Sequence, residues 1–246
     1  MSRRYWESEY FQQPSESELR MNIANTKQKA AKKGKSLHPI VVTGRNITKN
    51  WWGNAWCKNL ERYADFSSRI DRGKRYVRSG TVIDLQIEKG HVSAKVQGSR
   101  RTPYKVEILI SPMSEGACQK IIERCTTKVG NIEQLASGNF PEQMKELFGG
   151  HNGLFPSPKE ISFNCSCPDW ALMCKHVAAV LFGIGVRLDE DPLLFFELRG
   201  IDINRFIDVS LASKVERLLE NAETAANHSN RVIYKTDELT ELFGIL

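Results

Sequence analysis

Three cysteines and one histidine within a single twelve-residue stretch form the pattern in this chain best suited to chemistry, Cys165-x-Cys167-x6-Cys174-x-His176. Thiolates and imidazole are donors that suit Zn²⁺, and structural zinc sites use four such ligands in a tetrahedron. Because the protein would fill all four positions, no position stays open for a reacting water. The quartet therefore predicts one structural zinc ion bound by Cys165, Cys167, Cys174 and His176.

Other readings of the cysteines fit less well. The remaining thiols, on Cys57, Cys118 and Cys125, lie on helix-like segments and are explained as buried free cysteines. A Cys–His nucleophilic pair is usually distant in sequence and needs no additional thiols. A disulfide framework would require an oxidising compartment, and the sequence shows no secretory leader. His151 is a conceivable substitute ligand, although the quartet is already complete without it.

A strand and a helix are predicted to position the quartet. Residues 161–164 alternate apolar and polar side chains as a short strand does, and Pro168-Asp169 then predicts a turn. After the last cysteine, apolar residues recur at the spacing of one helix face, at Val177, Val180, Leu181 and Ile184.

The start of this helix predicts where the metal lies. Cys174 and His176 would be about 200° apart on an ideal helix, so we expect Cys174 to precede the first regular turn. Three thiolates on Zn²⁺ leave a charge of −1, which the helix dipole and Lys175 can offset. The site is therefore expected at the helix N-terminus.

At this point the sequence resembles the SWIM zinc finger family, as found in bacterial SWIM proteins of this size. The resemblance covers roughly residues 50 to 200 and rests on five segments: Trp51-Trp52-Gly53, residues 73–80 (GKRYVRSG), residues 96–100 (VQGSR), residues 165–170 (CSCPDW) and residues 174–180 (CKHVAAV). It implies a DNA-binding or protein-binding zinc module and no enzyme. Relatives occur in Mutator-type transposases, in partners of recombination proteins, and beside helicase-like remodelling ATPases.

Charge is distributed unevenly along the 246 residues, whose formal net charge is +6. The stretch from Arg69 to Lys105 has ten basic and three acidic residues, whereas the stretch after residue 186 has seven basic and twelve acidic residues. A basic surface can bind phosphates, although many proteins carry one that only meets solvent. We predict nucleic-acid binding, with DNA as the expected partner, through Arg72, Lys74, Arg75, Arg78, Arg100, Arg101 and Lys175.

The remaining periodicity predicts an α+β fold, a small antiparallel β-meander packed with helices and joined to the strand-turn-helix finger. Strands are expected at 81–88, 92–97 and 104–110, with Lys89-Gly90-His91 as a hairpin turn and the basic residues 69–78 in a loop. Helices are expected at 50–64, 114–129, 132–137, 141–148, 191–200 and 211–222, and at the C-terminus. In the first of these, Trp52 and Trp56 are read as core residues in preference to base-stacking ones.

Four segments follow from these patterns: a basic, largely flexible arm (1–49), an α+β domain (50–150), the finger (151–187) and an acidic helical region (188–246). The acidic region supports an alternative role as an adaptor, for which the resemblance suggests a helicase-like ATPase or a recombination protein as partner. The sequence has no phosphate loop, open metal site or paired carboxylates beside a histidine, so no enzyme is predicted. We expect a cytoplasmic protein without a membrane partner.

Overall fold

A four-stranded antiparallel sheet in the order β1-β2-β3-β4 forms one layer of the molecule. The computed structural model describes residues 14–128, 144–149 and 153–202, together with some positions between 208 and 222. The strands are β1 (Val82–Glu88), β2 (His91–Val96), β3 (Tyr104–Ile110) and β4 (Ile161–Cys165). The α+β class and the three-stranded meander are thereby confirmed. The strand before the first metal-ligand candidate is also confirmed, and it pairs directly with β3.

The β1–β2 hairpin closes through a two-residue turn, because Glu88 pairs with His91. Gly90 occupies the turn with a φ of 67°, a left-handed conformation that glycine adopts without strain. At the outer edge of β1, the Ile40 amide donates to the carbonyl of Val82, and the Leu85 amide donates to the carbonyl of His38. The chain before the first strand therefore covers that edge of the sheet.

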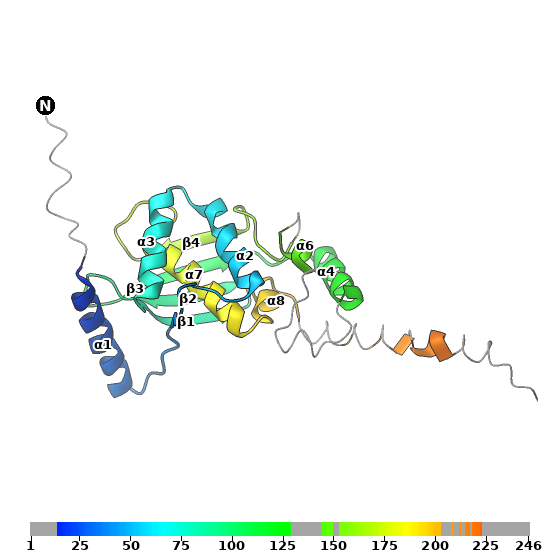
Figure 1. Cartoon of the computed structure of the whole chain (residues 1–246), viewed down its shortest axis with the longest axis horizontal. Coiled ribbons are helices and arrows are strands. Elements are labelled where there is room, and N and C mark those ends of the chain that lie inside the picture. Colours follow the sequence, from blue (N-terminus) through cyan, green and yellow to red (C-terminus); the bar gives the residue numbers. More distant parts are fainter. Residues whose placement is uncertain are drawn as a thin grey trace, which may run out of the picture.

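Helix α7 (Lys175–Glu190) is the centre of the core. It packs on the sheet on one side and on α2 (Trp51–Asn59) and α3 (Ser67–Arg78) on the other, as Figure 1 shows. Nearly every residue of α7 is buried, which is typical of a helix enclosed by other elements. The same core includes Trp52 and Trp56, whose burial confirms that they are core residues.

The basic run before the meander is a helix, and the expected loop was wrong. Only Ile70, Gly73 and Val77 of α3 are buried, so its apolar face is too narrow to be evident in a strongly basic sequence. Gly73 lies where an added Cβ would be 2.5 Å from the Cβ of Ala178 on α7. The missing side chain thus allows the two helices to pack closely.

The part of the chain that the structure describes has further helices at α1 (Glu16–Lys32), α4 (Glu115–Lys128), α6 (Lys145–Gly149) and α8 (Leu194–Leu198). The 3₁₀ turn η1 (Leu60–Tyr63) continues α2. Helix α1 begins with a capping box between Ser15 and Glu18, a signal that the sequence reading of the arm overlooked. The expected helix at 132–137 and the C-terminal one lie outside the described residues, whereas eight of the twelve positions of the one at 211–222 are described and are helical.

One hydrophobic core includes residues from Ile40 to Ile201 and therefore draws on all four sequence segments. The proposed boundaries between those segments stay a prediction. Among the described residues, no helix combines the length and apolar character needed to cross a membrane.

Candidate metal centre

Four candidate ligand atoms converge at the junction of β4 and α7. The Sγ atoms of Cys165, Cys167 and Cys174 and a ring nitrogen of His176 all lie within 4.8 Å of one another. The Nδ1 atom of His176 is 3.9 Å from the Sγ atoms of Cys165 and Cys174. Neighbouring ligands of a tetrahedral zinc ion with ordinary bond lengths are about 3.5–3.8 Å apart. The donor set and its spacing therefore fit one metal ion, for which zinc is the best match.

Cys174 occupies the N-cap of α7, as the sequence predicted. Its backbone is extended, with φ −73° and ψ 166°, and its Sγ accepts a hydrogen bond from the amide of Val177 at 3.5 Å. The partial positive charge of a helix N-terminus favours the thiolate. Cys174 thus combines a metal-ligand position with a helix cap.

Three thiols this close together cannot all lose their protons without a cation. The hydrogen bond between Cys165 and Cys167 raises the pKa of Cys165 and lowers that of Cys167. For Cys174, the hydrogen bond with Cys165 lowers the pKa, but the bond with Cys167 and burial raise it to about 11. A divalent cation would offset this repulsion and allow all three sulfurs to bind as thiolates.

The imidazole of His176 is held in one orientation by two tyrosines. Tyr104 stacks on it with ring centroids 4.3 Å apart, and Tyr76 meets it edge-on at 5.5 Å. Gly98 leaves room for this stack, because a Cβ there would lie 2.6 Å from the Tyr104 ring and 3.3 Å from Nε2 of His176. That Nε2 is buried and has no hydrogen-bond partner in the described part of the chain. The ring consequently presents Nδ1 to the sulfurs.

Two cations continue this stack of rings. The Nζ of Lys175 lies 5.2 Å from the centre of the Tyr76 ring, and the guanidinium of Arg100 lies 5.4 Å from the centre of Tyr104. Burial lowers the pKa of Lys175 below its ordinary value. Because zinc with three thiolates has a net charge of −1, these cations are well placed to balance the site.

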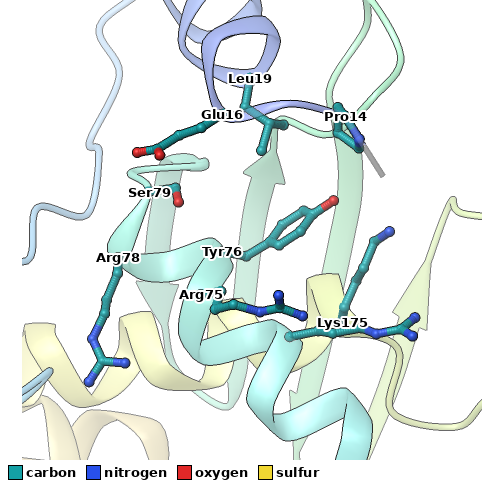
Figure 2. Close-up of a pocket in the computed structure, with 9 residues that line it drawn as sticks. Pro14, Glu16, Leu19, Arg75, Tyr76, Arg78, Ser79 and Lys175 are labelled. Carbon is teal, nitrogen blue, oxygen red and sulfur yellow. The ribbon is translucent and has the colours of Figure 1, made fainter. Parts of the chain in front are cut away.

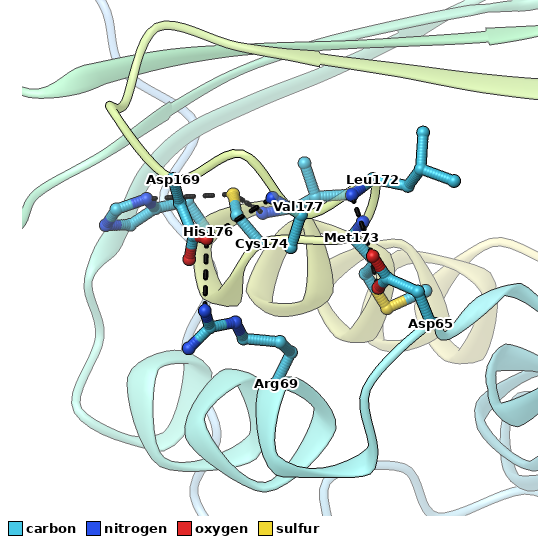
Figure 3. A network of polar contacts seen from close by, with 9 residues as sticks. Asp65, Arg69, Asp169, Leu172, Met173, Cys174, His176 and Val177 are labelled. Carbon is cyan, nitrogen blue, oxygen red and sulfur yellow. Dashed lines mark hydrogen bonds and ion pairs between the residues drawn. The ribbon is translucent and has the colours of Figure 1, made fainter. Parts of the chain in front are cut away.

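The loop between the two halves of the site is anchored to α3 and to Asp65, two residues before that helix (Figure 3). Arg69 forms an ion pair with Asp169 at 3.1 Å. The carboxylate of Asp65 accepts hydrogen bonds from the amides of Leu172 at 2.9 Å and Met173 at 3.4 Å. Neither aspartate was singled out as an anchor from the sequence. Asp169 appeared only as part of the predicted turn, and nothing in the sequence pointed to Asp65.

A cavity of about 370 Å³ opens beside the metal centre, between α1 and the C-terminal half of α3. Figure 2 shows residues that line it. Four of the seven residues predicted to bind nucleic acid line the cavity: Arg72, Arg75, Arg78 and Lys175. Tyr76 also lines it and thereby connects the cavity to His176.

The other three predicted contacts lie elsewhere. Lys74 sits over the ring of Phe182 at 5.9 Å and beside Asp71 at 3.7 Å, so it is engaged within the fold. Arg100 and Arg101 are exposed on the loop between β2 and β3. The binding role of all seven residues stays a prediction. His151 lies outside the described residues.

Comparison with known proteins finds a relative in Mycobacterium tuberculosis (strain ATCC 25618 / H37Rv), described as uncharacterized protein Rv2102. The two are 34% identical over 188 residues, which are 76% of this chain and 66% of the relative. The chain therefore spans just under two thirds of that protein. No family model matches the chain, and no solved structure matches it. The class that fold and site define is an α+β protein with a candidate Cys₃His metal centre.

Proposed function

We propose that this protein is a zinc-stabilised nucleic-acid-binding module whose partner is DNA. One observation carries the proposal: Arg72, Arg75 and Lys175 converge on one cavity beside the metal centre. Within the part of the chain that the structure describes, none of these three forms an ion pair with a carboxylate. The resemblance to SWIM zinc fingers supports the same function.

Unpaired cations that share a cavity favour an anionic ligand. Their mutual repulsion is strongest where water is partly excluded, and burial already lowers the pKa of Lys175. A phosphate oxygen would restore the charge balance and accept hydrogen bonds from both kinds of side chain. Arginine in particular binds phosphate through two parallel hydrogen bonds.

The metal would have a structural role in this function. Zn²⁺ held by Cys165, Cys167, Cys174 and His176 would join the end of β4 to the start of α7. Lys175 follows Cys174 directly and precedes His176, so the metal would set the position of one of the cavity's cations. With four protein ligands the ion would have no open position for chemistry.

Salt-titrated binding to DNA tests the proposal. Arg72→Glu with Arg75→Glu should weaken binding at least about tenfold at low salt and reduce the slope of log K against log salt by about 2, because two phosphate contacts are lost. Lys58→Glu with Lys120→Glu is the matched control, since it changes the net charge equally at exposed positions on α2 and α4. The proposal fails if both double variants weaken binding to the same degree, or if wild-type binding shows no salt slope.

The adaptor role depends on residues 188–246, most of which lie outside the described residues. It stays an expectation, as does the absence of enzymatic activity.

A further inference from the structure

A group of large apolar side chains projects into solvent from the loop of the metal centre. Trp170 is 81% exposed and Leu172 is 77% exposed, the two largest exposures among the large apolar residues described. Phe66, at the N-cap of α3, meets Trp170 edge-on with ring centroids 5.6 Å apart. Trp170 and Phe66 are here named the aromatic tip.

The loop that exposes Trp170 to solvent is anchored to the rest of the protein. Ala171 and Met173, which alternate with the exposed residues, are buried. Asp65 binds the amides of Leu172 and Met173, and Arg69 binds Asp169 (Figure 3). Metal ligands also bracket the loop on both sides. The anchored backbone therefore keeps Trp170 exposed to solvent, and such exposed apolar groups are typical of binding sites.

The aromatic tip lies at the N-terminal end of the helix that carries the basic residues. Phe66 precedes α3, and the basic residues of that helix recur every third position, at Arg69, Arg72, Arg75 and Arg78. Nine residues separate Phe66 from Arg75, which corresponds to about 14 Å along a helix axis. Successive steps of three residues turn gradually around a helix, so a flexible strand that leads from the exposed aromatic pair to the cavity lined by cations would wind around α3.

Aromatic and basic groups near one another are complementary to a single strand of nucleic acid. Its bases have free faces that can stack on aromatic side chains, while its phosphates follow a basic groove. In a duplex the base faces are already stacked on each other, so the aromatic tip would have nothing to stack on. A purely apolar protein partner would leave the neighbouring arginines without a counter-charge.

We infer that Trp170, supported by Phe66, stacks on an unpaired base of a single strand whose phosphates contact Arg72 and Arg75. This inference rests on the proposed function and adds the form of nucleic acid that the protein selects. Stacking on one base typically changes affinity about 5- to 100-fold on alanine substitution. It is largely indifferent to base identity, so weak sequence preference is expected.

Binding of an oligothymidylate of about 12 nucleotides and of a duplex of equal length tests the inference, with fluorescence anisotropy at matched salt as the measurement. The wild type should prefer the single strand. Trp170→Ala should weaken single-strand binding about 5- to 100-fold and leave duplex binding within about twofold. Trp170→Phe should retain most of the affinity, and Leu172→Ala, an equally exposed apolar control, should change it little. Unchanged zinc content would show that each variant is folded.

Tryptophan emission gives an independent readout. The chain has five tryptophans. Of the four that the structure describes, Trp52 and Trp56 are buried and Trp51 is half-buried, so quenching by the bound strand should come mainly from the exposed Trp170. Trp170→Phe should remove most of that quenching while the strand still binds.

The possible failures are distinguishable. If Trp170→Ala weakens binding of the single strand and of the duplex equally, or weakens neither, the stacking inference is wrong. The proposed function would still stand in that case if Arg72→Glu with Arg75→Glu weakens binding. The same holds if the wild type prefers the duplex. If the wild type binds neither form, the proposed function and the inference both fail.

Discussion

At the scale of single residues, the metal centre depends on groups that bind no metal. Tyr104 and Tyr76 confine the ring of His176, and Gly98 leaves the space that the stack requires. Such surrounding groups orient a ligand before the metal arrives and thereby reduce the ordering that binding requires. The Nε2 of His176 has no hydrogen-bond partner among the described residues, as expected for a ring positioned by packing.

Replacing Cys174 tests the site directly. Cys174→Ser should reduce the zinc content from about one ion per chain to a small fraction, because a hydroxyl does not ionise and is a poor zinc ligand. Loss of a structural metal should also lower the free energy of unfolding by about 3 kcal/mol or more. Metal analysis of the purified protein measures the first effect, and chemical unfolding measures the second.

Cys118→Ser is the matched control for this change, since Cys118 is a half-buried thiol on α4 outside the quartet. It should keep its zinc. A wild-type protein that contains no zinc, or a Cys174→Ser variant that retains it fully, would contradict the metal assignment.

At the scale of elements, α3 connects the metal centre to the basic cavity. Its buried side packs on α7, while its other side contributes Arg72, Arg75 and Arg78 to the cavity. The close approach at Gly73 sets the distance between the two helices. The positions of the cations relative to Lys175 therefore depend on one small residue.

Gly73→Ala should destabilise the protein. The new methyl group would lie 2.5 Å from the Cβ of Ala178, and such overpacking typically costs about 1–3 kcal/mol. This exceeds the gain of about 1 kcal/mol that alanine brings to a helix interior. The midpoint of urea unfolding should accordingly fall.

The control is Gly116→Ala on α4, where an added Cβ meets no atom within 4 Å. That variant should be as stable as the wild type or slightly more so. If Gly73→Ala behaved in the same way, the close helix contact would be wrong.

At the scale of the whole molecule, a buried ion pair ties the segment after α7 to the sheet. Arg199 is only 1% exposed, and its guanidinium donates to Glu160 at 2.5 Å and to the carbonyl of Ser111 at 3.1 Å. Ser111 and Glu160 lie at the ends of β3 and β4, which are distant in sequence. This pair therefore fastens α8 and the residues that follow it against the edge of the core.

Glu160→Gln should reduce stability in a pH-dependent way. Burial alone would raise the pKa of Glu160, but hydrogen bonds from Arg199 and Ser157 outweigh it and lower the pKa below the ordinary value of 4.5. A lowered folded-state pKa gives a contribution that is complete above pH 4.5 and is lost as the pH falls through the folded value.

Unfolding measurements at pH 7 should show a loss of about 2 kcal/mol, less than for a fully buried pair because Glu160 is about one third exposed. The difference from the wild type should shrink below pH 4. Glu190→Gln, in an exposed pair with Arg187, should change stability far less. An effect of Glu160→Gln that is constant with pH would exclude the ion pair as its cause.

The candidate ligands, the strand before them and the helix after them could be predicted from the sequence, because all these signals are local. A ligand's chemistry belongs to its residue type, and the alternation at 161–164 and the apolar face after Cys174 each span one element. The burial of Trp52 and Trp56 followed from helical spacing in the same way. The buried face of α3 is narrow and gave no comparable periodicity. Gly73 packs against α7, but a glycine does not count as an apolar residue when a sequence is searched for helical spacing.

By itself, the sequence determined which atoms can bind a metal and where charge accumulates along the chain. Only the tertiary structure decided that Tyr76, Tyr104 and Gly98 enclose His176, that Arg72 and Arg75 share a cavity with Lys175, and that Trp170 stands exposed beside Phe66. Each of these relations joins residues that are distant along the chain and are brought together by the packing of α3, α7 and the sheet. Contacts of that kind depend on the hydrophobic core as a whole, and no local pattern encodes them.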